Sequence, residues 1–186
     1  DGEVLVDGVN VKNYKFDTLY DKLGYVTQKA VLFAGSIREN VFFGESAAPE
    51  TDEELKNAIE LSQAEEFVDK LPDGAEHMIS QMGRNVSGGQ KQRLSIARAL
   101  SRKPEILVFD DSFSALDYKT DAKLREGLNE KLKDTTKIIV AQRISTIRHA
   151  DKIIVLDRGE AVGMGTHEEL MKNCDVYKEI ALSQLS

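Results

Sequence analysis

The chain has 186 residues and a formal net charge of −7, with 41% hydrophobic and 31% charged residues. This length suits one soluble globular domain with its own core, and the negative charge argues against a nucleic-acid-binding surface. The single cysteine, Cys174, excludes an internal disulfide, and the longest apolar run, Ala30 to Ala34, is far shorter than the ~20 residues that span a bilayer.

The first part of the chain alternates short apolar runs with turns. Val4 to Val6 and Val9 to Val11 flank Asp7-Gly8, a pair that suits a tight reversal, so we expect a β-hairpin. Leu23 to Val26 predicts a strand, and Gln28 begins a loop.

Helical patterns dominate the middle of the chain. Thr51 to Leu71 predicts two helices, each with a hydroxyl residue three positions before a glutamate. Thr51 with Glu54, and Ser62 with Glu65, are therefore expected to form capping boxes. Leu71 to Gly74 predicts the turn that follows.

Strands and helices alternate after this helical part. Ile106 to Phe109 and Ile138 to Ala141 are all-apolar runs, which indicates parallel strands buried on both faces. Between these runs, Leu124, Leu128 and Leu132 recur every four residues and form one stripe of a predicted helix.

The last part of the chain predicts one more hairpin and two helices. Ile153 to Leu156 is a strand pattern, which Asp157 to Gly159 turns into a second strand over Glu160 to Val162. Helical patterns cover Glu168 to Lys172 and Val176 to Ser183.

Ser87, Gly88, Gly89 and Gln90 open an amphipathic helix. Glycines let the backbone approach a ligand closely, and a helix N-terminus offers free N–H groups, for which phosphate is the natural ligand. Each glycine costs a helix roughly 1 kcal/mol, which indicates that this backbone serves a ligand. An ordinary capping box between Ser87 and Gln90 is the alternative interpretation.

Two carboxylates, Asp110 and Asp111, directly follow the apolar run Ile106 to Phe109. Ligands bind at the carboxyl ends of parallel strands, so we expect a carboxylate here to face a site. The alternative is that Asp110 only caps the next turn. Ser114 to Asp117 follows three residues later.

The order and spacing of Val86 to Gln90, Ile106 to Asp111 and Ser114 to Asp117 resemble the nucleotide-binding domain of ABC transporters, a likeness that runs from about residue 1 to 183. It implies an α/β fold, with a RecA-like P-loop NTPase core and an inserted helical subdomain. The implied segments are residues 1–37, up to and including the Q-loop; 38–103, the helical subdomain with the signature motif; and 104–186, the C-terminal RecA-like part with Walker B, D-loop and H-loop.

The resemblance also implies roles for site residues. The signature residues would reach across a dimer to the γ-phosphate held by a partner, although Val86 stands where the family usually has Leu. Asp110 and Gln28 would hold Mg²⁺. The residues implied to bind nucleotide are Gln28, Ser87, Gly88, Gly89, Gln90 and Asp117.

Asp111 and Gln142 occupy the two catalytic positions, where the family carries a Glu that orients or deprotonates the attacking water and a His that contacts the γ-phosphate. The Asp carboxylate falls on the order of 1.5 Å short, a misplacement that can cost about a hundredfold in rate. Gln donates hydrogen bonds but carries no positive charge. The pair predicts a degenerate site that binds but cleaves poorly; the alternative is that Asp111 still works slowly.

Further stretches carry the resemblance. Gln28 lies in a stretch that resembles the family's Q-loop, whereas Ser36 to Asn40 and Gly165 to Leu170 resemble the exporter branch of the family. Where exporters carry an acidic stretch before the signature, Ser80 to Gly83 keeps the glycine and lacks the acid. We expect His167 to begin a helix rather than to act as a ligand.

No glycine in the sequence is followed by lysine, so the chain has no G-x-x-x-x-G-K-[ST] phosphate loop. Asp1 to Gly8 resembles what the family places after that loop, so we expect an N-terminal truncation that removes the Walker A strand and helix. An incomplete core of this kind predicts an inactive fragment, with weak or no ATP binding and either self-association or an atypical sheet edge.

The resemblance as a whole predicts an ATP-binding and ATP-hydrolysing energy-coupling domain of a membrane exporter, with ATP and Mg²⁺ as cofactors. Its implied partners are a second half-transporter, in a heterodimer, and the transmembrane domain of the same parent chain, at the cytoplasmic face of the membrane. One alternative is a regulatory domain in which nucleotide only clamps a dimer. Another is a soluble cassette protein, such as a translation or DNA-repair factor, which usually has two cassettes or a long coiled-coil insertion.

Overall fold

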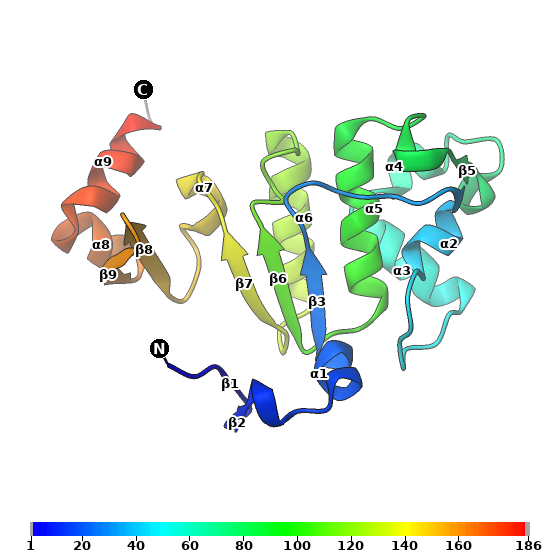
Figure 1. Ribbon diagram of the computed structural model, residues 1–186. Helices are drawn as coiled ribbons and strands as arrows, with labels where there is room; N and C mark the ends of the chain where they lie inside the picture. Colours follow the sequence, from blue (N-terminus) through cyan, green and yellow to red (C-terminus); the bar gives the residue numbers. More distant parts are fainter. Residues whose placement is uncertain (1, 185–186) are drawn as a thin grey trace. The chain divides into compact units, whose positions relative to one another are not determined.

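A three-stranded parallel sheet organises the first part of the chain in the computed structural model, which describes residues 2–184 (Figure 1). The fold is mixed α/β and divides into two units, Asp1–Val140 and Ala141–Ser186. The predicted boundaries at 37/38 and 103/104 stay predictions. Asp1 and residues 185–186, at the ends of the first and last predicted segments, lie outside the described residues.

The sheet has the order β3 (Leu23–Val26), β6 (Ile106–Asp110) and β7 (Thr136–Val140), and both pairings are parallel. These apolar runs form strands as predicted, although β7 begins and ends earlier than the predicted range Ile138 to Ala141. Val26 is opposite Phe109, and Val108 is opposite Ile138. Alternate residues therefore fall on two distinct faces.

One face of this sheet packs against α5 (Gly88–Ser101) and α6 (Tyr118–Lys131); in Figure 1, α6 lies behind the sheet and α5 stands next to β3. Leu107 and Phe109 are fully buried on that face, in one core with residues of both helices. The fold permits this close packing because Gly24 has no side chain: a Cβ there would lie 2.8 Å from both Leu107 and Pro104.

The other face of the sheet, which we call the open face, contains Tyr25, Val108, Ile138 and Val140. Tyr25, Ile138 and Val140 expose 56%, 51% and 52% of their surface. The prediction that both strands are buried on both faces is therefore wrong for β7. Within residues 2–140, the part of the first unit that the structure describes, the helices of the core pack on the opposite face.

The helical part of the first unit contains α2 (Ile37–Val41), α3 (Asp52–Leu61) and α4 (Glu65–Val68), which confirms the two helices expected over Thr51 to Leu71. Thr51 caps α3 by accepting from the N–H of Glu54, but the capping box predicted there is only half formed, because the Glu54 carboxylate accepts from Nζ of Lys103. The second predicted capping box is wrong, because Ser62 ends α3 and its hydroxyl donates to Ile59. A pairing that local patterns did not predict joins β4 (Gly35–Ser36) to β5 (Met78–Ile79), with 3₁₀ turns at Gly74–Glu76 and Gln81–Gly83.

The predicted N-terminal hairpin is confirmed as β1 (Leu5–Val6) and β2 (Val9–Asn10). Asp7 and Gly8 both have positive φ, 50° and 76°, as a two-residue hairpin turn requires. A 3₁₀ turn, η1 (Val11–Asn13), and α1 (Phe16–Lys22) lead from this hairpin to β3.

The predicted leucine stripe of α6 is confirmed in large part. Leu124 and Leu128 are 0% and 1% exposed in the core of the first unit. Leu132 lies one residue beyond the helix, at its C-cap, and packs partly buried against the same core.

The second unit has its own small core. It contains α7 (Ile144–Ile147), the hairpin of β8 (Ile153–Asp157) and β9 (Glu160–Gly165), and then α8 (His167–Asn173) and α9 (Asp175–Ser183), which confirms the hairpin and both predicted helices. His167 begins α8, as expected. The core residues are Ile153, Val155, Leu170, Cys174 and Tyr177.

No helix within residues 2–184 combines the length and the apolar character that crossing a membrane requires.

Candidate functional site

The carboxyl end of β6 brings two of the predicted site residues together. Asp111 leaves the strand with its N–H donating to Val140, at 3.0 Å. Its Oδ2 accepts a hydrogen bond from Nε2 of Gln28, also at 3.0 Å. The residues at the predicted Q-loop and catalytic positions are thus in direct contact, although they are 83 positions apart in the sequence.

Asp111 has a left-handed backbone, with φ 45°. Most residues lose about 1 kcal/mol or more in this conformation, whereas Asp and Asn adopt it more readily than other side chains. The hydroxyl of Ser114 donates to the Asp111 carbonyl at 2.7 Å and closes the turn. The short acid therefore fits the local backbone better than a longer side chain does.

Asp110 is the last residue of β6 and lies on the open face. Its Oδ2 accepts a hydrogen bond from the hydroxyl of Tyr25, at 3.0 Å. Asp110 is therefore held by Tyr25 and Asp111 by Gln28, and both contacts come from β3 or from the loop that follows it.

Asp110 and Gln28 supply oxygen donors, which are the ligands that Mg²⁺ prefers. Within the described part of the chain, no three His, Cys, Asp or Glu side chains gather as they do around an ion that protein side chains alone enclose. This donor set suits Mg²⁺, because that ion takes one or two protein ligands and completes its coordination with phosphates and water.

The signature residues Ser87 to Gln90 begin α5 with a complete capping box. The Ser87 hydroxyl accepts from the Gln90 N–H at 3.3 Å, and Oε1 of Gln90 accepts from the Ser87 N–H at 2.8 Å. The capping interpretation is thus confirmed for this pair. It does not account for Gly88, because a Cβ added there would meet nothing within 4 Å. The fold of this chain gives no steric reason for that glycine.

Two side chains of α5 hold the loop around Gln28, and sequence reasoning missed both. Gln92 donates to the Thr27 carbonyl at 3.1 Å, and Arg98 donates to the Val31 carbonyl at 2.9 Å. Gln92 is only 1% exposed, and burial lowers the pKa of Arg98. Polar residues on the apolar face of a predicted helix are the signal that could have revealed them.

Arg98 is also fixed by aromatic and polar neighbours. Its guanidinium lies over the rings of Phe33 and Phe43, at 5.4 and 5.5 Å, and its Nε donates to the Asn40 carbonyl at 2.7 Å. Asn40 in turn bonds the N–H and the carbonyl of Phe33, both at 2.9 Å. These contacts tie the segment after Gln28 to the signature helix.

Asp117, predicted to bind nucleotide, is the N-cap of α6. Its carboxylate accepts from the N–H groups of Lys119 and Thr120 and from the Thr120 hydroxyl. Hydrogen bonds from Thr120 lower the pKa of Asp117 below the ordinary 3.8; the bond from the Thr120 backbone has the largest effect, and the bond from its side chain the next largest. The capping role is structural, and the nucleotide role stays a prediction.

We expect Asp117→Asn to reduce the acid sensitivity of the protein. A lowered folded-state pKa stabilises the fold above pH 3.8, and this contribution is lost as the pH falls through the folded-state pKa. Asn keeps the cap but does not titrate. The urea midpoint of the wild type should therefore fall further than that of the variant between pH 7 and acid. Equal falls would contradict this assignment.

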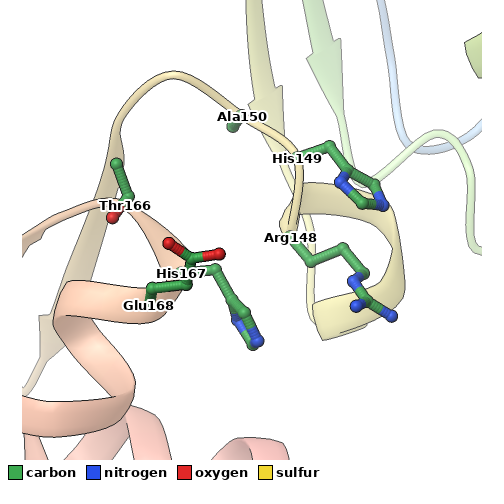
Figure 2. A pocket seen from close by; sticks show the side chains of 6 residues that line it. All are labelled: Arg148, His149, Ala150, Thr166, His167 and Glu168. Carbon is green, nitrogen blue, oxygen red and sulfur yellow. The ribbon is translucent and has the colours of Figure 1, made fainter.

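Gln142 belongs to the second unit, where its carbonyl accepts from Nε2 of Gln184 at 2.7 Å. The same unit contains a pocket, shown in Figure 2, that none of the predicted catalytic residues lines. His167 contributes to the pocket, and its Nδ1 lies 2.9 Å from the Tyr177 hydroxyl. The pocket residues are Arg148, His149, Ala150, Thr166, His167 and Glu168.

Comparison with known proteins finds similarity to ABC transporter proteins. A family model described as "ABC transporter" matches residues 1–114. The chain is 45% identical, over 98% of its length, to an uncharacterized ABC transporter ATP-binding protein of Mycobacterium tuberculosis, of which it covers 31%. It is 42% identical, over 99% of its length, to ABC transporter B family member 21 of Arabidopsis thaliana, of which it covers 14%.

Among solved structures, a bacterial Atm1-family ABC exporter with ATP bound matches all of this chain with a TM-score of 0.93 and 33% sequence identity. The chain covers 32% of that exporter chain. It therefore spans about a third or less of the length of these similar proteins.

Proposed function

This chain belongs to the ABC transporter family, as a nucleotide-binding domain of the exporter type, and from that premise we propose that it drives a membrane exporter while its own ATP site is degenerate. Domains of this family bind ATP and are in general ATPases. The similarity to an exporter structure along the whole chain supports the assignment to a transporter rather than to a soluble cassette protein.

The contact between Gln28 and Asp111 carries the proposal of a degenerate site. The amide of Gln28 occupies one oxygen of a carboxylate that is already one methylene short. A catalytic base must come within hydrogen-bond reach of the water that it activates. An acid held back on a left-handed turn and bonded to Gln28 is poorly placed for that task, and Gln142 cannot supply the positive charge of a histidine.

The signature residues Ser87 to Gln90 are proposed to act on a partner's nucleotide. The open space at Gly88 supports this, because a group from another molecule can approach the amides there. The partners in this proposal are a second half-transporter and the transmembrane domain of the parent chain, at the cytoplasmic face of the membrane. The helical subdomain over 38–103 would present the signature.

Asp110 and Gln28 are the residues proposed to hold Mg²⁺, which when bound neutralises charge on the β- and γ-phosphates. The 186 residues contain no phosphate loop, and β7 is paired only with β6 within the described residues. Both observations support an incomplete RecA-like core in this chain. We accordingly propose that the chain alone binds Mg-ATP weakly and does not hydrolyse it.

The proposal is tested by measuring ATP turnover of the full-length parent protein alone and after co-expression with a second half-transporter that carries Glu and His at the matching positions. The parent alone is expected to hydrolyse little ATP, and the pair to hydrolyse at least tenfold more, because one competent site suffices. Equal turnover by the parent alone would overturn the degenerate site. Tight ATP binding without hydrolysis by any pair would favour the regulatory alternative.

A further inference from the structure

Tyr25 has no role in the function proposed so far, yet its position is unusual. It stands within β3, in a strand pattern that otherwise favours apolar residues. Its neighbours Gly24 and Val26 are buried, whereas Tyr25 is more than half exposed on the open face. Its hydroxyl contacts an acid, Asp110.

The register of the sheet explains that contact. Tyr25 is opposite Val108, and Asp110 lies two positions further along β6, on the same face. A tyrosine side chain spans this diagonal, and its O–H donates to Oδ2 of Asp110 at 3.0 Å. A phenylalanine would occupy the same place without reaching the carboxylate.

Within residues 2–184, this is the one side-chain hydrogen bond that the Asp110 carboxylate accepts. It fixes Oδ2 and leaves Oδ1 without a side-chain donor.

We propose that Tyr25 is a positioning residue for the metal-binding carboxylate: its O–H holds Oδ2 of Asp110 and so presents Oδ1 to the cation. The inference rests on the proposed function, in which Asp110 holds Mg²⁺. Hydrogen bonds to a ligating carboxylate orient it, and their removal typically costs about 10- to 100-fold in metal affinity.

The test uses the full-length protein with its partner, loaded with a non-hydrolysable ATP analogue. Mn²⁺ is titrated as the probe and free Mn²⁺ is followed by electron paramagnetic resonance. Asp110→Asn identifies the class of Mn²⁺ sites that belongs to this chain. Tyr25→Phe should weaken that class about 10- to 100-fold, with no change in nucleotide binding measured in EDTA. Tyr20→Phe is the matched control, because Tyr20 is similarly exposed and its ring stacks on Phe16.

The outcomes separate the two proposals. If Asp110→Asn removes a class of Mn²⁺ sites and Tyr25→Phe leaves that class unchanged, the role of Tyr25 is overturned while the proposed function stands. If Asp110→Asn changes no class, the metal assignment of the proposed function fails first. If Tyr25→Phe weakened nucleotide binding in EDTA as much as it weakened Mn²⁺ binding, the effect would be a general structural one, and the positioning role would also be overturned.

Discussion

Combining Asp111→Glu with Gln142→His is expected to raise ATP hydrolysis at this chain's site about a hundredfold, because the longer acid reaches the attacking water. The family resemblance implies that position 142 contacts the γ-phosphate, and Gln142→His would restore a side chain that can carry positive charge there. The measurement is ATP turnover of the full-length pair, in a background where the partner's own catalytic Glu is replaced by Gln. In that background, remaining turnover comes from this chain's site.

The backbone at position 111 limits this gain. Asp111 has φ 45°, a conformation in which Glu is less favourable than Asp. Some loss of stability should therefore accompany Asp111→Glu. Asp111→Asn is the matched control, since Asn tolerates this backbone but cannot act as a base. Turnover that stayed unchanged in the double variant would show that the two substitutions do not limit this site.

Gly88→Ala is expected to lower ATP turnover of the pair about a hundredfold, because the added methyl displaces the partner's γ-phosphate from the amides at the start of α5. The same change should leave the melting temperature unchanged or raise it. A Cβ at position 88 meets nothing within 4 Å, and Ala is up to about 1 kcal/mol better than Gly in a helix.

The opposite directions of these two effects make the Gly88→Ala experiment specific. A variant that lost turnover through misfolding would also melt earlier. The matched control is the equivalent glycine-to-alanine change in the partner's signature. In this proposal the partner's signature completes only the weak site of this chain, so that change should alter turnover little. Full turnover with Gly88→Ala would contradict a role for these amides in the partner's site.

Elements with local signals were predictable from the sequence. The hairpin at Asp7-Gly8 follows from the positive φ that this pair tolerates, and the cap at Thr51 follows from its spacing to Glu54. The same spacing failed at Ser62, because that hydroxyl bonds backward to the helix it ends rather than forward to the next one. Motif spacing alone does not distinguish these two directions.

Contacts between distant segments were not predictable in the same way. The carboxyl ends of parallel strands predicted a site at Asp110 and Asp111, but not that Tyr25 and Gln28 would each bond one of these acids. Ile138 lies in an all-apolar run, and the sequence does not record which face of its strand a helix covers. Such features depend on packing rather than on local pattern.

The paired attachment of the Gln28 loop to α5 has a mechanical consequence. Gln92 fixes the residue before Gln28, and Arg98 fixes a carbonyl three residues after it. These two hydrogen bonds join the helix that begins at Gly88 to the loop that carries Gln28, so a displacement of the helix would pull on the loop. If α5 rotated to place the signature residues against a partner's nucleotide, Gln28 would shift relative to Asp111. Nucleotide binding at the partner's site would then change the 3.0 Å hydrogen bond between Gln28 and Asp111 in this chain's own site.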